Sequence, residues 1–385
     1  MHRAVTPPLL TAKANPLKIV MFPQSTPLTA VVLALIGPGP SFGAAADVPP
    51  LRGLNRSDLL QTVPVAATAQ PAKNPQEWET RRKAALDGFQ QVAGSLPGEP
   101  MRCDLDLNVE EEVDCGTYLR RRISYVSSPG GRVPAYLCIP KAALTGKPAP
   151  AVLCLHPTDN LVGHGVVVGL GGKPNRQYAS ELAEQGFVTL SPSYPLLAKY
   201  QPDLKALGFS SGTMKAIWDN IRGLDLLETL PFVRKEAGFA TIGHSLGGHN
   251  SIYTAVFDPR LRVIVSSCGF DSFLDYMGGN IKGWVQERYM LRMGDYLGKP
   301  EAVPFDFYEL VAALAPRPFL VNAPLRDSNF KWDSVDRILA AAKAVYALHS
   351  AEKHLRVLHP DCDHDFPDEA RKAAYTLIRD TLGTP

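Results

Sequence analysis

Apolar and polar positions follow two different periods from about residue 100 onward. Short continuous apolar runs are typical of strands buried on both faces, and longer segments with apolar residues three or four apart are typical of helices. Because the two kinds of segment alternate, the pattern predicts parallel strands joined by helical crossovers. The predicted strands are 151–155, 187–191, 239–242, 261–267, 318–321 and 355–358, and the predicted helices are 175–185, 212–230, 334–348 and a last helix ending near 382.

An antiparallel hairpin is predicted before these strands. Residues 118–127 alternate between apolar and polar, a Ser-Pro-Gly-Gly turn follows, and residues 133–139 return. Two such runs around a Pro-Gly turn are typical of a hairpin. We expect it to form the antiparallel edge of a mostly parallel sheet.

The first hundred residues divide into two parts. Residues 1–27 carry basic but no acidic side chains, and an apolar run at 28–36 and small residues at 43–46 follow. This order predicts a signal peptide over 1–46, and hence a secreted or periplasmic protein. The alternative is an unstructured tail. The apolar run is too short to serve as a membrane anchor.

Residues 47–100 are expected to form a linker and an N-terminal helical extension. The linker is rich in proline, alanine and threonine as far as residue 73. Asn74 then has the character of an N-cap, with Pro75 at the first helical position and Glu77 three residues after the cap. The predicted helix runs to about Ala93. Residues 101–385 would form the main domain.

Composition narrows the class of protein. The chain has 385 residues, of which 45% are hydrophobic, and a formal net charge of +2. This length suits one large α/β domain with additions, and the balanced charge argues against a nucleic-acid partner. Six cysteines are too few for a disulfide scaffold. Cys154 and Cys268 are predicted to be buried thiols, and Cys103 and Cys115 could pair in an exported protein.

The most informative stretch runs from Phe239 to the glycines after Ser245. A short apolar strand leads directly into Gly243-His-Ser245-Leu-Gly247. This Gly-x-Ser-x-Gly pattern between a strand and a helix is the nucleophile elbow of an α/β-hydrolase. We expect glycine at 243 and 247 because a Cβ there would collide with the neighbouring strand or helix.

Two backbone amides are candidates for an oxyanion hole. The N–H of Leu246 lies at the start of the helix after the serine, where it can face a developing negative charge. The second donor of this fold comes from the loop after an earlier strand, which here follows His156. Pro157 has no N–H, so Thr158 is the better candidate.

The acid and the base of a catalytic triad should follow the serine in that order. Asp327 lies in the loop after the predicted strand 318–321 and is the preferred acid. Asp333 and Asp336 stand at the start of the next helix, where a cap or a solvated face explains them. Asp271, after the preceding strand, is a further alternative.

His364 is the preferred base, in a polar loop after the last strand. His359 is a nearby competitor, which we interpret as the end of that strand. His244 and His249 are too close to Ser245 in sequence to fold back onto it, and we interpret them as packing or hydrogen-bonding residues. His364 would take the proton of Ser245 as general base.

Neither a metal nor a cofactor is expected. The glycine-rich stretch 169–174 does not fit a dinucleotide fingerprint, because Pro174 stands at the third glycine. The alternating aspartates at 361–365 are similar to a calcium loop, but Phe366 replaces the glycine required at its sixth position.

A lid insertion is expected from 269 to about 314. The helical and strand periods stop there, and the segment is rich in aromatic residues. An insertion at this point commonly covers the serine. Its aromatic side chains could line an acyl or aryl pocket or merely pack the insertion, and both interpretations remain open.

The chain resembles the dienelactone hydrolase and acetyl xylan esterase-like branch of the α/β-hydrolases over roughly residues 100–385. The stretches that carry the resemblance are IGHSLGGHN at 242–250, APRP at 315–318 and DHDFP at 363–367. It implies a cofactor-free serine hydrolase of carboxylic esters, with a small-molecule or carbohydrate ester as substrate and acetylated polysaccharide as one candidate. Dienelactone hydrolases proper use a cysteine where this chain has Ser245, and His156-Pro157 replaces the usual His-Gly.

Two other classes of function are kept as alternatives. A serine peptidase or amidase of the same fold commonly carries a large additional domain, for which the N-terminal hundred residues are too few. A catalytically silent binding domain usually lacks a triad member, whereas all three candidates are present here.

Overall fold

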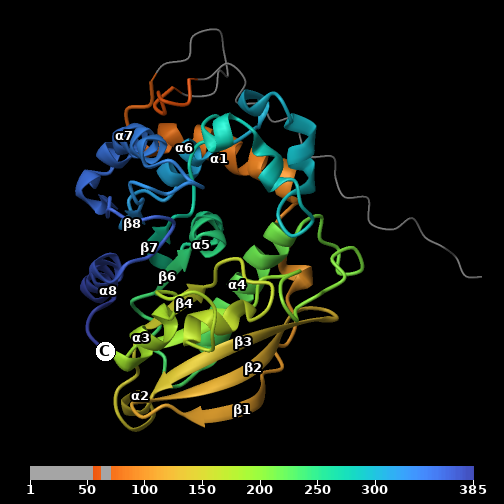
Figure 1. Cartoon of the computed structure of the whole chain (residues 1–385), viewed down its shortest axis with the longest axis vertical. Helices are drawn as coiled ribbons and strands as arrows, with labels where there is room; N and C mark the ends of the chain where they lie inside the picture. Colours follow the sequence, from red (N-terminus) through yellow and green to blue (C-terminus); the bar gives the residue numbers. More distant parts are fainter. Residues whose placement is uncertain (1–54, 62–70) are drawn as a thin grey trace, which may run out of the picture. The chain divides into compact units, whose positions relative to one another are not determined.

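The computed structural model describes residues 55–61 and 71–385. A nine-stranded sheet in the order β1-β2-β3-β5-β4-β6-β7-β8-β9 forms its centre (Figure 1). The strands are β1 (Asn108–Asp114), β2 (Tyr118–Ser128), β3 (Gly131–Pro140), β4 (Ala151–Leu155), β5 (Val188–Pro192), β6 (Phe239–His244), β7 (Leu261–Ser267), β8 (Phe319–Asn322) and β9 (Leu355–Leu358). The helices are α1 (Pro75–Ala93), α2 (Lys141–Thr145), α3 (Tyr178–Glu184), α4 (Gly212–Thr229), α5 (Leu246–Phe257), α6 (Phe307–Ala312), α7 (Trp332–Leu348) and α8 (Asp368–Leu382).

The sheet is parallel from β5 to β9 and antiparallel at its other end. Strands β5, β4, β6, β7, β8 and β9 pair in parallel, whereas β1, β2, β3 and β5 pair antiparallel. The predicted hairpin is confirmed, with β2 and β3 joined across Ser128↔Gly131. The edge strand is β1 rather than the hairpin itself. Nearly all side chains of β1 are exposed, so its sequence shows no alternation of buried apolar and exposed polar residues.

Alternation along the central strands divides the core into two layers. Val152 and Cys154 of β4 belong to a cluster with residues of α3 and α8. Leu153 and Leu155 belong to the larger cluster on the other face, with residues of α4, α5 and α7. Helices therefore cover both faces of the sheet, which buries the parallel strands on both sides. This mostly parallel sheet flanked by helices is an α/β-hydrolase fold and confirms the predicted fold class.

Helix α1 begins as its sequence predicts. The Asn74 side chain accepts a hydrogen bond from the Glu77 amide at 2.9 Å, and Pro75 occupies the first turn. The helix packs against α6, at the end of the molecule away from β1–β3 (Figure 1). Arg81 of α1 is fully buried and pairs with Glu309 of α6 at 3.0 Å. The extension is thus part of the described fold and not a separate arm.

The segment between β7 and α6 contains four short 3₁₀ turns between Tyr276 and Ala302. Phe270, Phe273 and Phe305 are buried in the larger core cluster. Most aromatic side chains of residues 269–314 therefore pack the segment against the core. Tyr289 is an exception and reaches the candidate site described below.

Several predictions concern residues at or beyond the ends of these elements. The predicted signal peptide (1–46) and most of the predicted linker lie outside the described residues. The predicted helix 175–185 begins only at Tyr178, because Asn175 adopts a left-handed backbone with φ 62°. Within residues 55–61 and 71–385, no helix is both long and apolar enough to cross a membrane.

Cys103 and Cys115 are free thiols in the structure. They flank the seven-residue strand β1, one before it and one in the turn after it. A strand of that length separates its ends by roughly 20 Å, whereas a disulfide requires Cα atoms within about 7 Å. The pairing left open by the sequence is therefore not formed.

Candidate active site

Ser245 lies on a strained turn between β6 and α5. Its backbone angles are φ 55° and ψ −119°, which non-glycine residues rarely adopt. The Ser245 amide donates to the carbonyl of Ser267 at the end of β7, at 2.8 Å. Its hydroxyl makes no capping bond to α5 and lines a pocket instead. The bond to Ser267 holds the turn, and the glycines two residues before and two residues after Ser245 leave room for it.

The two glycines around Ser245 are required by close backbone contacts. A Cβ on Gly243 would lie 2.1 Å from the carbonyl oxygen of Gly247. A Cβ on Gly247 would lie 1.9 Å from the carbonyl oxygen of Leu155 at the end of β4. Real Cβ atoms do not approach backbone this closely, so only glycine lets α5 pass over β4 and β6. The expected collisions with strand and helix are both present.

His364 and Asp327 meet at the carboxyl ends of the last two strands. His364 Nδ1 lies 2.9 Å from Asp327 Oδ2 and 3.0 Å from Oδ1. The Asp327 side chain is 1% exposed and that of His364 is 26% exposed. The buried carboxylate therefore holds an imidazole whose other edge is open to a pocket.

Asp327 is held as a carboxylate. Burial raises its pKa, but hydrogen bonds from His364 and from the amides of Asn329 and Phe330 outweigh it, and the pKa lies below its usual value. Oδ1 accepts those two amides at 2.8 and 3.2 Å. The orientation of the carboxyl group is thus set by the backbone, and its charge favours a proton on His364 Nδ1.

Arg176 holds the His364 loop in place. It is 4% exposed and forms an ion pair with Asp365 at 2.5 Å, and its Nη2 donates to the His364 carbonyl at 3.3 Å. Asn175 also donates to Asp365, at 2.8 Å. Asp365 is therefore an anchor of the histidine loop, while Asp361 and Asp363 pair with an exposed arginine.

Hydrogen bonds between buried polar groups connect the strand ends next to the triad candidates. Asn322 Nδ2 donates to Ser267 Oγ at 2.8 Å and to the Asp365 carbonyl at 2.9 Å. Ser267 Oγ also lies 2.9 Å from His244 Nδ1. One small network thus connects β6, β7, β8 and the His364 loop, as a preorganised site requires.

Ser245, His364, His244 and Thr158 line one small pocket of about 120 Å³. Arg176 and Lys173 also line it. No hydrogen bond joins Ser245 Oγ to His364 in the part of the chain that the structure describes. Such bonds are often long before substrate binds and tighten in the reacting complex. The preferred nucleophile and base therefore face the same space.

Thr158 is exposed at the edge of this pocket, and its hydroxyl lies 3.1 Å from the hydroxyl of Tyr289. Leu246 begins α5 directly after the serine and is buried. Tyr289 packs against the small cluster that contains Leu246. One tyrosine of the segment between β7 and α6 thus contacts both regions that carry the oxyanion candidates. The sequence showed only that the segment is aromatic.

His156 explains how the loop before Thr158 is held. Its Nδ1 is 2.7 Å from the Pro157 carbonyl, and its Nε2 accepts the Tyr194 amide at 2.8 Å. Accepting that amide requires a neutral ring, and burial lowers the pKa of His156 to about 4. The residue is a neutral link between the loop and the end of β5.

The competing bases and acids are engaged elsewhere. His359 bonds the Ala323 carbonyl at 2.7 Å and Asp336 at 3.0 Å, and it does not line the serine pocket. Asp333 pairs with Arg337. Asp271 accepts the Lys331 amide at 3.1 Å, and burial raises its pKa to about 8. None of these aspartates is bonded to His364.

His244 and His249 are both buried, as expected for packing residues. His249 bonds the Gly269 carbonyl at 3.1 Å. His244, however, also stands beside His364 with ring centroids 4.8 Å apart. Burial and the nearby Arg176 hold its pKa well below the usual value, so its ring is neutral beside the pocket.

Cys268 was not expected near the site. Its Sγ lies with atoms of Asp327 and His364 within 4.8 Å, the one group of three such residues found among the described residues that could hold a metal. Burial and the Asp327 charge raise the pKa of Cys268 well above its usual value. The thiol is therefore a neutral neighbour of the hydrogen-bonded Asp327 and His364.

The fold and the elbow together place the chain among proteins of the α/β-hydrolase fold. No family model matches the sequence. The chain is 27% identical over 244 residues to YtaP of Bacillus subtilis strain 168, provisionally described as a hydrolase; the match covers 60% of this chain and 78% of that protein. It is 29% identical over 123 residues to the carbohydrate esterase MZ0003 of an unknown prokaryotic organism, which covers 28% of this chain and 27% of that protein.

Solved structures agree in fold. A glucuronoyl esterase from Solibacter usitatus superposes with a TM-score of 0.67 and 19% identity, covering 86% of this chain and 98% of that one. A CE15 glucuronoyl esterase from Teredinibacter turnerae T7901 gives a TM-score of 0.62 and 18% identity, covering 84% and 88%. At these identities the likeness shows the fold, which is the one that the resemblance in sequence implied.

Proposed function

We propose that the protein is a serine esterase that hydrolyses carboxylic esters through an acyl-enzyme on Ser245. One observation carries this proposal: Ser245 lies on a strained elbow and shares a pocket with His364, whose Nδ1 is bonded to the buried Asp327. These are the roles of nucleophile, base and orienting acid in the order that this fold uses.

The reaction follows from this geometry. His364 Nε2 takes the proton of Ser245 as the hydroxyl oxygen attacks the ester carbonyl, and it returns the proton to the leaving alcohol. Asp327 keeps the proton on Nδ1 and stabilises the imidazolium. The amides of Leu246 and Thr158 would bind the oxyanion, where loss of one donor typically costs about 3 kcal/mol. Water then hydrolyses the acyl-enzyme by the same steps.

We propose a carbohydrate ester with a small acyl group as the substrate. The esterases with which the chain is compared support a carbohydrate. The serine pocket of about 120 Å³ supports a small acyl group, since sites for larger ligands measure about 300–1,000 Å³. The sequence pattern at 1–46 supports export to the periplasm or the medium, where carbohydrate polymers are found.

A series of p-nitrophenyl esters from acetyl to long acyl tests this function. The full chain should prefer acetyl, and Ser245→Ala should abolish turnover of every ester. A fluorophosphonate probe should label the wild type and not the variant. Labelling that survives in Ser245→Ala would exclude this serine as the nucleophile. Turnover of p-nitroanilides but of no ester would instead favour an amidase.

A further inference from the structure

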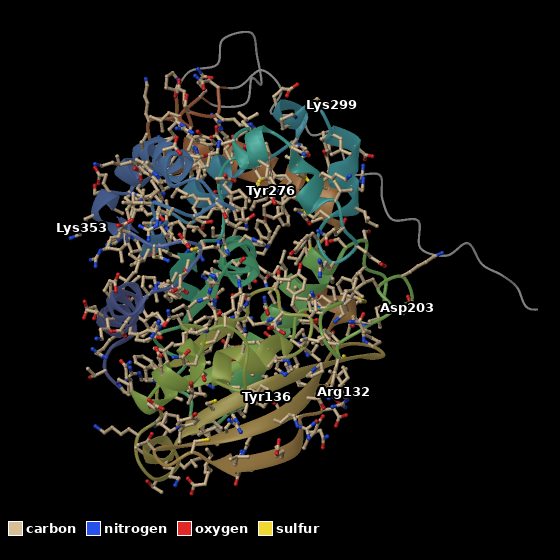
Figure 2. All side chains as sticks on the ribbon, in the orientation of Figure 1. Arg132, Tyr136, Asp203, Tyr276, Lys299 and Lys353 are labelled. Atoms are coloured by element: carbon tan, nitrogen blue, oxygen red, sulfur yellow. The ribbon has the colours of Figure 1, made fainter. Side chains whose placement is uncertain are left out.

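A second cleft lies beside the serine pocket. It measures about 560 Å³, within the range of small-molecule sites. Its floor is the face of β1–β3, and its walls are the loops after β4 and after β5. The lining residues used below are Glu110, Arg122, Tyr136, Leu161, His164 and Lys199; Tyr136 is labelled on the sheet in Figure 2.

The walls of the cleft are held in shape by backbone geometry. A Cβ on Gly163 would lie 2.9 Å from the Cβ of Ala198, so the two loops meet there. Leu196 and Ala198 adopt left-handed backbones with φ 61° and 46°. The His164 and Tyr136 rings lie with centroids 4.9 Å apart. A site that is formed before its ligand arrives loses less freedom on binding.

The lining combines apolar surface with polar groups that lack partners. Leu161 is 88% exposed at the cleft, an unusual position for a leucine. His164 Nε2 is buried and has no hydrogen-bond partner in the described part of the chain. Lys199 makes no ion pair with any described residue, whereas Arg122 pairs with Glu110. Buried polar groups are normally satisfied, so the His164 nitrogen points to a ligand that supplies a hydrogen bond.

The cleft and the serine pocket open at the same edge of the sheet. Ser193, at the end of β5, lines the cleft, and Ser245 follows β6. Strand β4 lies between β5 and β6, so the two ends are roughly 10 Å apart at the usual strand spacing. One loop borders both spaces, with Asp159 in the serine pocket and Leu161 in the cleft.

We propose that this cleft binds a sugar residue of the carbohydrate chain whose ester is cleaved at Ser245. The C–H face of a pyranose ring packs on Tyr136 and Leu161, and its hydroxyls bond His164, Lys199 and the Glu110–Arg122 pair. This inference rests on the proposed function for its ligand class. In this proposal the cleft provides affinity for the polymer, and the ester is cleaved in the serine pocket.

The test compares two matched double variants. Leu161→Ala/Lys199→Ala removes exposed side chains of the cleft. Leu297→Ala/Lys299→Ala removes the same residue types at an exposed position elsewhere, where Lys299 is labelled in Figure 2. Each pair is also made in the Ser245→Ala background, and its migration is measured in gels containing acetylated glucuronoxylan. Thermal melting confirms that every variant is folded.

We expect the cleft variant alone to weaken glycan binding by about tenfold. It should raise KM for the polymer by a similar factor and leave kcat/KM for p-nitrophenyl acetate within about twofold. Equal glycan binding by both double variants would overturn the inference. The binding gel uses Ser245→Ala protein and does not depend on catalysis. It therefore tests glycan binding by the cleft even if the wild type cleaves no ester.

Discussion

Asp327→Asn tests the proposed orienting role of Asp327 separately from its place in the fold. Oδ1 accepts the Asn329 and Phe330 amides, so the carbonyl oxygen of an asparagine takes that position. The amide nitrogen then occupies the position of Oδ2, 2.9 Å from His364 Nδ1. Because that nitrogen donates, it requires Nδ1 to accept, and the ring proton moves to Nε2.

An imidazole with its proton on Nε2 cannot take the serine proton. The same substitution in the well-studied serine protease triad lowers kcat by about 10⁴-fold, which corresponds to about 5 kcal/mol of transition-state stabilisation. We expect a similar loss of kcat for p-nitrophenyl acetate, with KM little changed, because the asparagine leaves the substrate pocket intact. Steady-state kinetics on the purified full chain measures both constants.

The chain offers a matched control in its second histidine–aspartate pair. His359 Nε2 and Asp336 Oδ1 lie 3.0 Å apart, and Asp336→Asn makes the same chemical change there. We expect that variant to keep kcat within about twofold. If Asp327→Asn retained a tenth or more of wild-type kcat, or if Asp336→Asn lost as much as Asp327→Asn, the assignment of the acid would be wrong.

Three further predictions follow from single contacts. Gly247→Ala places a Cβ 1.9 Å from the Leu155 carbonyl and should destabilise the protein by more than about 3 kcal/mol, seen as a lower melting temperature. Tyr289→Phe removes the hydroxyl 3.1 Å from Thr158 and should lower kcat/KM by about two- to tenfold. Asp271→Asn should gain stability relative to the wild type as pH rises from about 4 to 8, measured by urea unfolding at each pH.

The sign of the last prediction follows from proton linkage. The folded state keeps a proton on Asp271 up to a pKa of about 8, whereas the unfolded chain releases it near pH 4. The wild type therefore loses stability over that interval, by up to about 5 kcal/mol, and asparagine does not. A stability difference independent of pH would contradict this reasoning.

The other two predictions have their own controls. Gly98→Ala places its Cβ in ordinary contact, 3.7 Å from the Pro100 ring, and should leave the melting temperature nearly unchanged. A Gly247→Ala protein as stable as Gly98→Ala would argue against the crowded elbow. Tyr289→Phe with unchanged kcat/KM would show that the contact with Thr158 does not support the reaction.

The sequence alone was sufficient for the elbow and the central strands. Residues 239–247 form a strand, a turn and a helix start within nine positions, so local conformation specifies them. The order of Ser245, Asp327 and His364 was also readable, because each follows a predicted strand. The alternation of apolar and polar residues did not predict β1, because nearly all of its side chains are exposed.

The supporting contacts needed the tertiary structure. Arg176 and Asp365 are 189 positions apart, and Thr158 and Tyr289 are 131 apart. Nothing local marks either pair, because such contacts depend on how loops close over the carboxyl edge of the sheet. Cys268 was recognised as buried, but its place beside Asp327 depends on the packing of β7 against β8.

The two histidine–aspartate pairs show where the division lies. From the residue types and their order, His364 with Asp327 and His359 with Asp336 were both conceivable, and both pairs form at about 3 Å. Periodicity determined which segments are buried strands and which turn carries the serine. The tertiary structure was needed to show that His364 lines the pocket of Ser245 and that His359 does not. The reason is that the direction of a side chain at a strand end depends on packing with residues far away in the sequence.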